Sequence, residues 1–298
     1  MSTPRQTGAR WQEETPWQEG APWQGGASSR SGAPWQRGAP PHEGTPWSGA
    51  PQGTAAREES FAALCRSSPW RWETLRFSLH WVPGAQDRPA QPVRAWLRRP
   101  SDLRVETLRG HALYTSTSLE RSRDDFYVAD TPRSWLLPPG LVTPVYDDDG
   151  LVTRRPEAAY GDPVFGGGRW QAILDPVELV GPAPVPPYLP EQRPARLRSL
   201  AAGAFAKRRV WCATVEPTVR YRPVTAAHPL APGPTRIAVD TATGVCVYSH
   251  VLSGPYAGQG HRLVVEGVDE YQLDDLFTRE DFDLTDVSHH LPWRVPGH

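Results

Sequence analysis

Histidine is the side chain most often used for proton transfer and metal binding near neutral pH, so the histidines are the first candidates for reactive chemistry. Most of the nine stand alone in the sequence: His80, His111, His228, His250 and His261, with His289-His290 adjacent near the end. The sequence contains no His-Glu-x-x-His metal motif, no Gly-x-Ser-x-Gly turn and no phosphate-binding loop. The run Gly166-Gly167-Gly168 lacks a strand before it and a helix after it, which predicts a flexible loop. We therefore expect no catalytic residue and no enzyme.

Two acidic clusters are candidates for binding a cation. Asp147-Asp148-Asp149-Gly150 lacks the spaced ligands and the closing glutamate of a calcium loop. Its Asp149-Gly150 pair instead predicts a tight hairpin turn with positive φ angles. We expect Asp281, Asp283 and Asp286 to be solvated, the alternative being that they bind a cation or a basic partner. The sequence thus predicts no metal site and no cofactor.

The three cysteines are the remaining candidates for metal or redox chemistry. Cys65, Cys212 and Cys246 form no Cys-x-x-Cys unit, which argues against a zinc knuckle or a redox motif. Cys212 and Cys246 both fall in predicted strands and could face each other across a sheet. Buried free thiols usually behave as small apolar residues, so we expect all three in the core.

The charge balance gives no sign of a nucleic acid or an anionic membrane as partner. The 298 residues carry a formal net charge of -1, and Lys207 is the only lysine beside many arginines, a bias typical of a GC-rich gene. The chain has no apolar run that would make a signal peptide, a lipidated cysteine site or a membrane span. We therefore expect a cytoplasmic location.

Residues 1–59 are predicted to be a disordered tail in front of one β domain at 60–298. Residues 15–50 repeat a six-residue unit with proline and glycine, which disfavour both helix and sheet. The units place a tryptophan after a proline at Trp17, Trp23, Trp35 and Trp47. Spaced Pro-Trp pairs in flexible chain can dock in aromatic-lined grooves, which makes a protein partner one hypothesis for this tail. The alternative is repeat expansion with no binding role.

Alternating apolar and polar residues then predict an antiparallel sheet. In the strand from Trp72 to Val82 the apolar odd positions are Leu75, Phe77, Leu79 and Trp81, while Arg76, Ser78 and His80 face the other way. The stretch from Val93 to Glu106 reads as two short strands that turn at Pro100-Ser101. A second hairpin is expected at 235–250, with its turn at Thr241-Ala242-Thr243-Gly244. Further strands are expected at 111–118, 125–130, 210–217 and 262–266, and short helices after Ser60 and at 175–180, the latter capped by Asp175 before Pro176.

These pieces resemble, in this order, the lipoprotein-carrier fold shared by bacterial outer-membrane lipoprotein carriers, lipid-binding mycobacterial lipoproteins and anti-sigma-factor regulators of envelope stress. The match rests on Trp96 to Glu106, Ile237 to Val245, the acidic Asp274 to Phe277, and the Asp-Pro-x-Glu-Leu segment at 175–179. The match covers residues 70 to 280, and over this range the chain is similar to a divergent member of actinobacterial type. Exported members carry a signal sequence, which is not seen here. The resemblance implies a mainly β fold with short helices (α+β), in which one strongly curved antiparallel sheet forms a half-barrel. It also implies that the protein binds a ligand and is not an enzyme.

The resemblance also implies an apolar or lipid-like ligand in the concave face of the sheet, beneath the helix at 175–180 acting as a lid. The expected ligand-binding residues are the apolar residues of the first strands and one residue of the lid: Leu75, Phe77, Leu79, Trp81, Leu97, Val105 and Leu179. Periodicity alone does not distinguish a lined pocket from a filled core. An alternative is a cytosolic protein-interaction or regulatory module that uses the same sheet together with the Pro-Trp tail.

Overall fold

The fold is described here from a computed structural model, for residues 54–82, 91–117, 141–156, 169–224 and 229–278. The repeat tail, the expected strand at 125–130, the Gly166-Gly167-Gly168 run, His228 and the acidic residues 281–286 lie outside these ranges.

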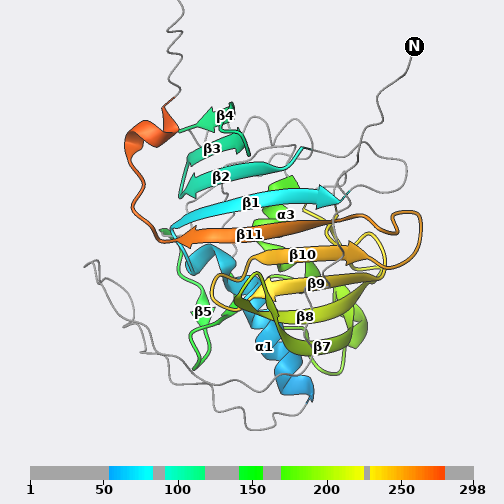
Figure 1. Ribbon diagram of the computed structural model, residues 1–298. Coiled ribbons are helices and arrows are strands. Elements are labelled where there is room, and N and C mark those ends of the chain that lie inside the picture. The colour runs from blue at the N-terminus through cyan, green and yellow to red at the C-terminus, as the bar shows by residue number, and fades with distance from the viewer. Residues whose placement is uncertain (1–53, 83–90, 118–140, 157–168, 225–228, 279–298) are drawn as a thin grey trace, which may run out of the picture.

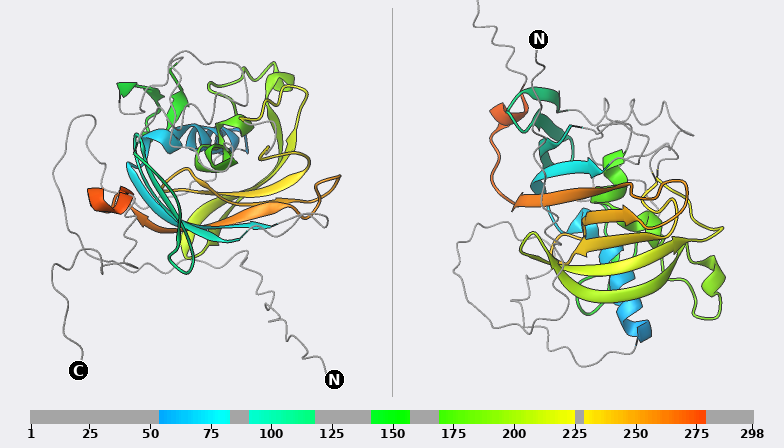
Figure 2. Two further views of the ribbon diagram at one scale, coloured as in Figure 1. Left: turned by 90° about the horizontal axis from the view of Figure 1, so that it is seen from above. Right: turned by 45° about the vertical axis from the view of Figure 1, so that its right-hand side comes forward.

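One nine-stranded antiparallel sheet, in the order β4-β3-β2-β1-β11-β10-β9-β8-β7, forms the framework (Figure 1). Its strands are β1 (Thr74–Val82), β2 (Val93–Arg98), β3 (Asp102–Thr107), β4 (Ala112–Ser116), β7 (Ala195–Phe205), β8 (Arg208–Pro217), β9 (Thr235–Asp240), β10 (Cys246–Val251) and β11 (Gly260–Val268). The sheet curves around the helices α1 (Thr54–Ser67) and α3 (Arg169–Leu174), which lie on its concave side (Figure 2). The predicted fold class, mainly β with short helices and one strongly curved antiparallel sheet, is confirmed.

The alternation predicted for the first strands holds in the structure. Leu75, Phe77 and Leu79 of β1 are buried on the concave face, and Leu97 of β2 pairs with Leu75 and with Leu103 of β3. Because side chains alternate along a strand, Arg76, Ser78 and the following His80 point to the convex face. β1 lies between β2 and β11, so the beginning and the end of the domain meet in the middle of the sheet.

The β9–β10 hairpin has the predicted turn, and its turn packs against α1. The Asp240 carboxylate accepts hydrogen bonds from the backbone N–H of Ala242 (3.0 Å) and from the backbone N–H of Thr243 (2.8 Å). Gly244 has a φ of +73°, and a Cβ there would lie 3.0 Å from the Leu64 carbonyl oxygen. A glycine is therefore needed both for the backbone conformation and for the close contact with the end of α1.

Three local predictions need correction. The first helix begins at Thr54, within the stretch expected to belong to the disordered tail, and its Glu58 and Glu59 pair with Arg193 and Arg66. The helix expected at 175–180 is a 3₁₀ helix, η3 (Pro176–Leu179), preceded by α3. Asp175 makes no side-chain cap, because its carboxylate pairs with Arg155 instead.

The hairpin predicted around Asp149-Gly150 is present as β5 (Val145–Tyr146) and β6 (Val152–Arg154). Only Gly150 has a positive φ, at +74°, and the expectation of a positive φ at Asp149 is wrong. The Asp147 carboxylate closes the loop by accepting the backbone N–H of Asp149 (3.0 Å) and that of Leu151 (2.7 Å). This acidic cluster therefore has a structural role in the turn.

Short 3₁₀ helices complete the described domain: η1 (Ser68–Trp70) follows α1, η4 (Pro190–Gln192) precedes β7, and η5 (Asp274–Phe277) follows β11. η5 is the acidic segment named in the family resemblance. Arg98 of β2 lies with its guanidinium 4.8 Å from the centre of the Phe277 ring, and Arg104 of β3 donates to the Leu276 carbonyl (2.9 Å). The end of the described chain is thus fixed to the convex side of β2 and β3.

Candidate binding site

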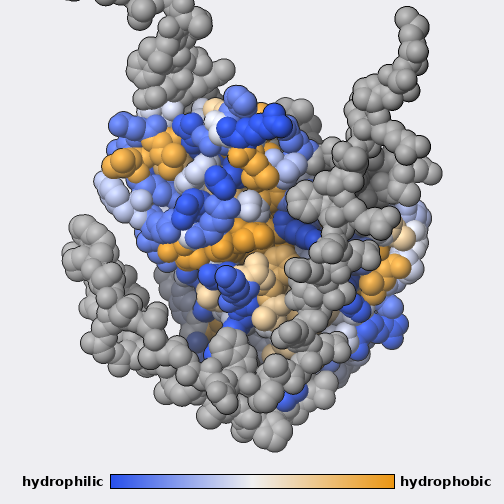
Figure 3. Space-filling model, viewed as in Figure 1, coloured by the Kyte–Doolittle hydropathy of each residue, from blue (hydrophilic) through white to orange (hydrophobic). Residues whose placement is uncertain are grey.

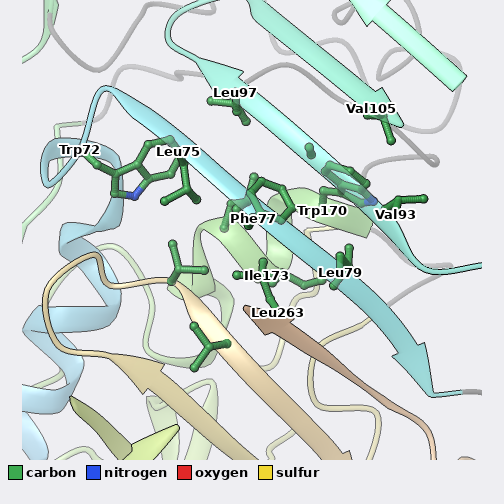
Figure 4. Packing of buried hydrophobic residues seen from close by; sticks show 14 of the residues in the cluster. Trp72, Leu75, Phe77, Leu79, Val93, Leu97, Val105, Trp170, Ile173 and Leu263 are labelled. Carbon is green, nitrogen blue, oxygen red and sulfur yellow. The ribbon is translucent and has the colours of Figure 1, made fainter. Parts of the chain in front are cut away.

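The structure places most of the predicted ligand-binding residues in one filled core. Leu75, Phe77, Leu79, Leu97 and Val105 are each no more than 1% exposed. The indole of Trp170 on α3 meets the Phe77 ring edge to face, with 5.3 Å between ring centres (Figure 4). The space left between these strands and α3 is too small for a water molecule. This part of the concave face is packed against α3.

Of the remaining two predicted residues, Trp81 packs against that core as a partly buried neighbour, and Leu179 lies outside it. Trp81 sits near the end of β1, where it is partly buried, and its ring centre is 5.7 Å from that of His261. Leu179 belongs to a second apolar cluster between α1 and the strands β7, β8 and β9. The structure therefore does not bring Leu179 together with the other predicted residues.

A cavity of about 50 Å³ opens beside Leu179, where α1, η3, β7 and β8 meet. We call it the β7 pocket. Its walls are mainly apolar, and four charged side chains also line it: Phe61, Ala62, Leu179, Val180, Val185, Pro194, Ala195, Leu197 and Val215, with Glu58, Glu59, Arg66 and Arg193. A cavity that holds benzene has about three times this volume. The β7 pocket can therefore take a few waters or a small aliphatic group, but not an acyl chain.

Two ion pairs fix the charged residues of the β7 pocket. Arg66 is buried, and it donates from Nη1 to Glu59 (3.1 Å) and from Nε to the Gly181 carbonyl (3.0 Å). Burial lowers the pKa of Arg66, and the hydrogen bond to Glu59 opposes this shift. Arg193 pairs with Glu58 at 2.8 Å between Nη1 and Oε2, and both side chains are partly exposed. The pocket thus has a mainly apolar lining, together with the buried Arg66 and the partly exposed Arg193, Glu58 and Glu59.

The buried ion pair between Arg155 and Asp175 holds α1 next to α3. Arg155 donates from Nη1 to Asp175 Oδ2 (2.8 Å) and from Nη2 to Oδ1 of the same carboxylate. Its Nε donates to the Arg66 carbonyl at the end of α1 (2.8 Å). A cation at this end of a helix also interacts favourably with the helix dipole. Arg155 could not be predicted from the sequence, because it and Asp175 lie in separate segments and no sequence motif links them.

Glu178 anchors the segment after β8 to η3. Its carboxylate accepts from the Tyr221 hydroxyl, from the Val224 N–H (2.8 Å) and from the Leu230 N–H (2.7 Å). Burial raises the pKa of Glu178, and these three hydrogen bonds oppose the shift. Burial also raises the pKa of Tyr221, and the nearby Glu178 carboxylate adds to that increase.

Replacing Glu178 with glutamine should lower the free energy of unfolding by about 1–3 kcal/mol at pH 7. The backbone N–H groups meet an acceptor in the wild-type carboxylate, whereas the glutamine amide group presents a donor to them. A carboxyl whose pKa is raised on folding favours the folded state below its unfolded pKa and loses that contribution as pH rises. The wild type should therefore gain stability relative to Glu178→Gln when the pH is lowered from 7 towards 5. Urea unfolding of both proteins at the two pH values measures this. A stability difference that stays constant or shrinks as the pH falls would contradict the assignment.

His261 is the only predicted candidate histidine that the structure buries within the described ranges. Its Nε2 donates to the Cys246 carbonyl, which can only accept, and Nδ1 lies 2.7 Å from Ser249 Oγ. The serine and histidine are both buried, which shields the pair from a substrate. His80, His111 and His250 lie at the surface, the last only partly exposed. Among the described residues, no three histidine, cysteine or acidic side chains are grouped so that they could hold a metal ion.

The three cysteines are free thiols. Cys65 and Cys246 are buried as expected, whereas Cys212 is only partly buried. Cys212 pairs with Ala238 in the register and Cys246 with the next residue, Val239, so the two cysteines point to opposite faces of the sheet. The idea that they face each other is wrong. Burial raises the pKa of Cys246 to about 12 and also raises that of Cys65, so both thiols stay protonated and unreactive at neutral pH.

Comparisons with known proteins give distant structural similarities. No protein-family model matches the chain, and no curated protein sequence matches it. A solved structure titled "Crystal structure of MucB" superposes with a TM-score of 0.39 and 13% sequence identity. The alignment covers 77% of this chain and 64% of that chain, so this chain spans less than two thirds of the length of MucB. This is a similarity of fold and has no bearing on function.

In the described parts of the chain, no helix has the length and the apolar character needed to cross a membrane.

Proposed function

We propose that this protein is a non-enzymatic binding protein, and that it binds an extended segment of a partner protein along β7 with one small aliphatic side chain in the β7 pocket. The observation that carries this proposal is the position of the pocket. Ala195 and Leu197 at the start of β7 line it, and β7 is the last strand of the sheet. An added strand could therefore pair with β7 and place a side chain directly into the cavity.

Strand addition suits both the edge strand and the small volume. Among the described strands, only β8 pairs with β7, so no described strand covers the other edge of this eleven-residue strand. Partners that add a strand gain affinity from backbone hydrogen bonds and specificity from pockets for alternate side chains. A side chain the size of valine contributes about 1.5–3 kcal/mol when fully buried.

A second candidate is the lipid-like ligand expected from the sequence, bound in the concavity of the sheet. The observation that favours this candidate is the shortness of α3, the helix that covers the concavity, which has only six residues. Its Trp170 and Ile173 side chains fill the space in which an acyl chain would lie. An acyl chain binds there if α3 moves away, and each buried methylene then adds about 0.8 kcal/mol. This route requires a conformational change, whereas the β7 pocket is already open.

The proposal is tested by fluorescence anisotropy with a labelled octapeptide of alternating threonine and valine. The peptide should bind saturably, and replacing its central valine with glycine should weaken binding about tenfold or more, because the cavity then stays empty. Ala62→Leu should fill the β7 pocket and weaken binding by a similar factor with little loss of stability. Ala112→Leu, on the exposed β4 edge at the other end of the sheet, is the matched control and should leave binding unchanged.

A fluorescent fatty-acid analogue separates the two candidates. If this probe binds saturably to wild type and to Ala62→Leu alike while the octapeptide does not bind, the concavity is the site and the peptide proposal fails.

A further inference from the structure

Several arginines on the convex face of the sheet pair with carboxylates, whereas two others make no ion pair with a described residue. Figure 3 views this face and shows hydrophilic and hydrophobic residues side by side. The neutralised arginines lie in ion pairs between β1, β2, β3, β11 and the segment after β11: Arg76 with Glu270, Arg94 with Glu266, Arg98 with Asp102, and Arg104 with Glu106. Arg236 and Arg262 are exposed, and no described carboxylate lies within ion-pair distance of either.

The strand register brings these two arginines together around one tyrosine. Arg262 of β11 lies opposite Tyr248 of β10, and His80 of β1 lies opposite Arg262. Arg236 of β9 lies opposite His250, two residues along β10 from Tyr248. We call these five residues, His80, Arg236, Tyr248, His250 and Arg262, the Tyr248 patch. It crosses four adjacent strands on one face, which is a width of about 14 Å.

Both guanidinium groups also act electrostatically on Tyr248. Half-burial raises the pKa of Tyr248, and the positive charges of Arg262 and Arg236 both oppose this increase. The Tyr248 ring also packs against Phe205 of β7, with 5.9 Å between ring centres. The patch therefore combines a fixed aromatic ring with two cations that pair with no described carboxylate.

This combination is complementary to a peptide carboxylate. Arginine and tyrosine are enriched at protein interfaces, and a guanidinium binds a carboxylate through two parallel hydrogen bonds. Proteins that bind a nucleic-acid backbone make about 6–10 phosphate contacts, more than two arginines and two histidines supply. An extended peptide of six residues spans about 20 Å, which is enough to cross the patch.

We propose that the Tyr248 patch is a docking site for an acidic segment of a partner protein, separate from the β7 pocket. Carboxylates spaced along the segment pair with Arg236 and Arg262, and the chain between them lies over Tyr248. The site lies on the convex side of the sheet, whereas the β7 pocket opens towards α1, so each site can be occupied without the other.

The test measures anisotropy of a fluorescein-labelled hexaglutamate peptide at low salt. Wild type should bind it, and the double variant Arg236→Gln/Arg262→Gln should bind it about tenfold or more weakly. The matched control Arg76→Gln/Arg94→Gln removes the same charge from the same face, and it should change binding less than about threefold because these arginines are already paired. Urea unfolding of each variant shows that it is folded, and the threonine-valine octapeptide should bind all of them equally.

Three results would overturn the proposal. The first is that both double variants weaken hexaglutamate binding equally, and the second is that a labelled single-stranded DNA of twelve nucleotides binds as tightly as the peptide. The third is that the wild type self-associates and the Arg236→Gln/Arg262→Gln variant does not. The second result would make the patch a nucleic-acid site, and the third would make a second copy of this chain its occupant. None of the three affects the proposal for the β7 pocket.

Discussion

Replacing Leu97 with aspartate should leave little folded protein at 25 °C. Leu97 is completely buried between Leu75 and Leu103 on the concave face, where a carboxylate would have neither water nor a cation to pair with. Burying an unpaired charge or protonating it against apolar neighbours costs about 4–5 kcal/mol or more, which is a large part of the stability of a domain. Circular dichroism and urea unfolding of the purified variant measure the loss.

The matched control is Ser78→Asp, which introduces the same side chain on the opposite face of the sheet. Ser78 pairs with Arg94 across β1 and β2, so the new carboxylate lies next to a cation and should change stability by no more than about 1 kcal/mol. Arg98 would be a poor control, because it pairs with Asp102 and donates to the Gln272 carbonyl. Equal effects of Leu97→Asp and Ser78→Asp would show that the assignment of the two faces is wrong.

Replacing Asp175 with alanine should destabilise the protein by about 3–5 kcal/mol, because Arg155 then stays buried without its counter-ion. Arg155 also donates to the Arg66 carbonyl, so its side chain cannot turn to solvent without a further loss. The double variant Arg155→Met/Asp175→Ala removes both charges and should recover part of this stability. A double-mutant cycle from urea unfolding gives the coupling energy. Additive effects of the two single substitutions would mean that the pair does not hold α1 to α3.

The sheet could be predicted from the sequence because its strands alternate clearly. Leu75, Phe77 and Leu79 repeat every second residue, and the β9–β10 turn has a glycine where a positive φ is needed. These signals are local, since each depends on neighbours within a few residues. The resemblance implied a strongly curved antiparallel sheet, and the structure has one.

The candidate site could not be predicted in the same way, because it depends on contacts between distant segments. The alternation of Phe77 and Leu79 is the same whether α3 packs on them or a ligand does, so only the position of Trp170 shows that this face is filled. The β7 pocket joins α1 to β7, more than a hundred residues later, and only Leu179 among the predicted residues lines it. The Arg155–Asp175 pair has no sequence signature either.

Hydrogen–deuterium exchange with and without the threonine-valine octapeptide tests directly whether a partner adds a strand to β7. Edge amides that point away from β8 exchange quickly when they meet only water. Bound peptide should slow exchange in the first half of β7, Ala195 to Leu200, and leave exchange at the β4 edge unchanged. Bound peptide with unchanged exchange in β7, or with altered exchange in α3 and β1 instead, would contradict strand addition to β7.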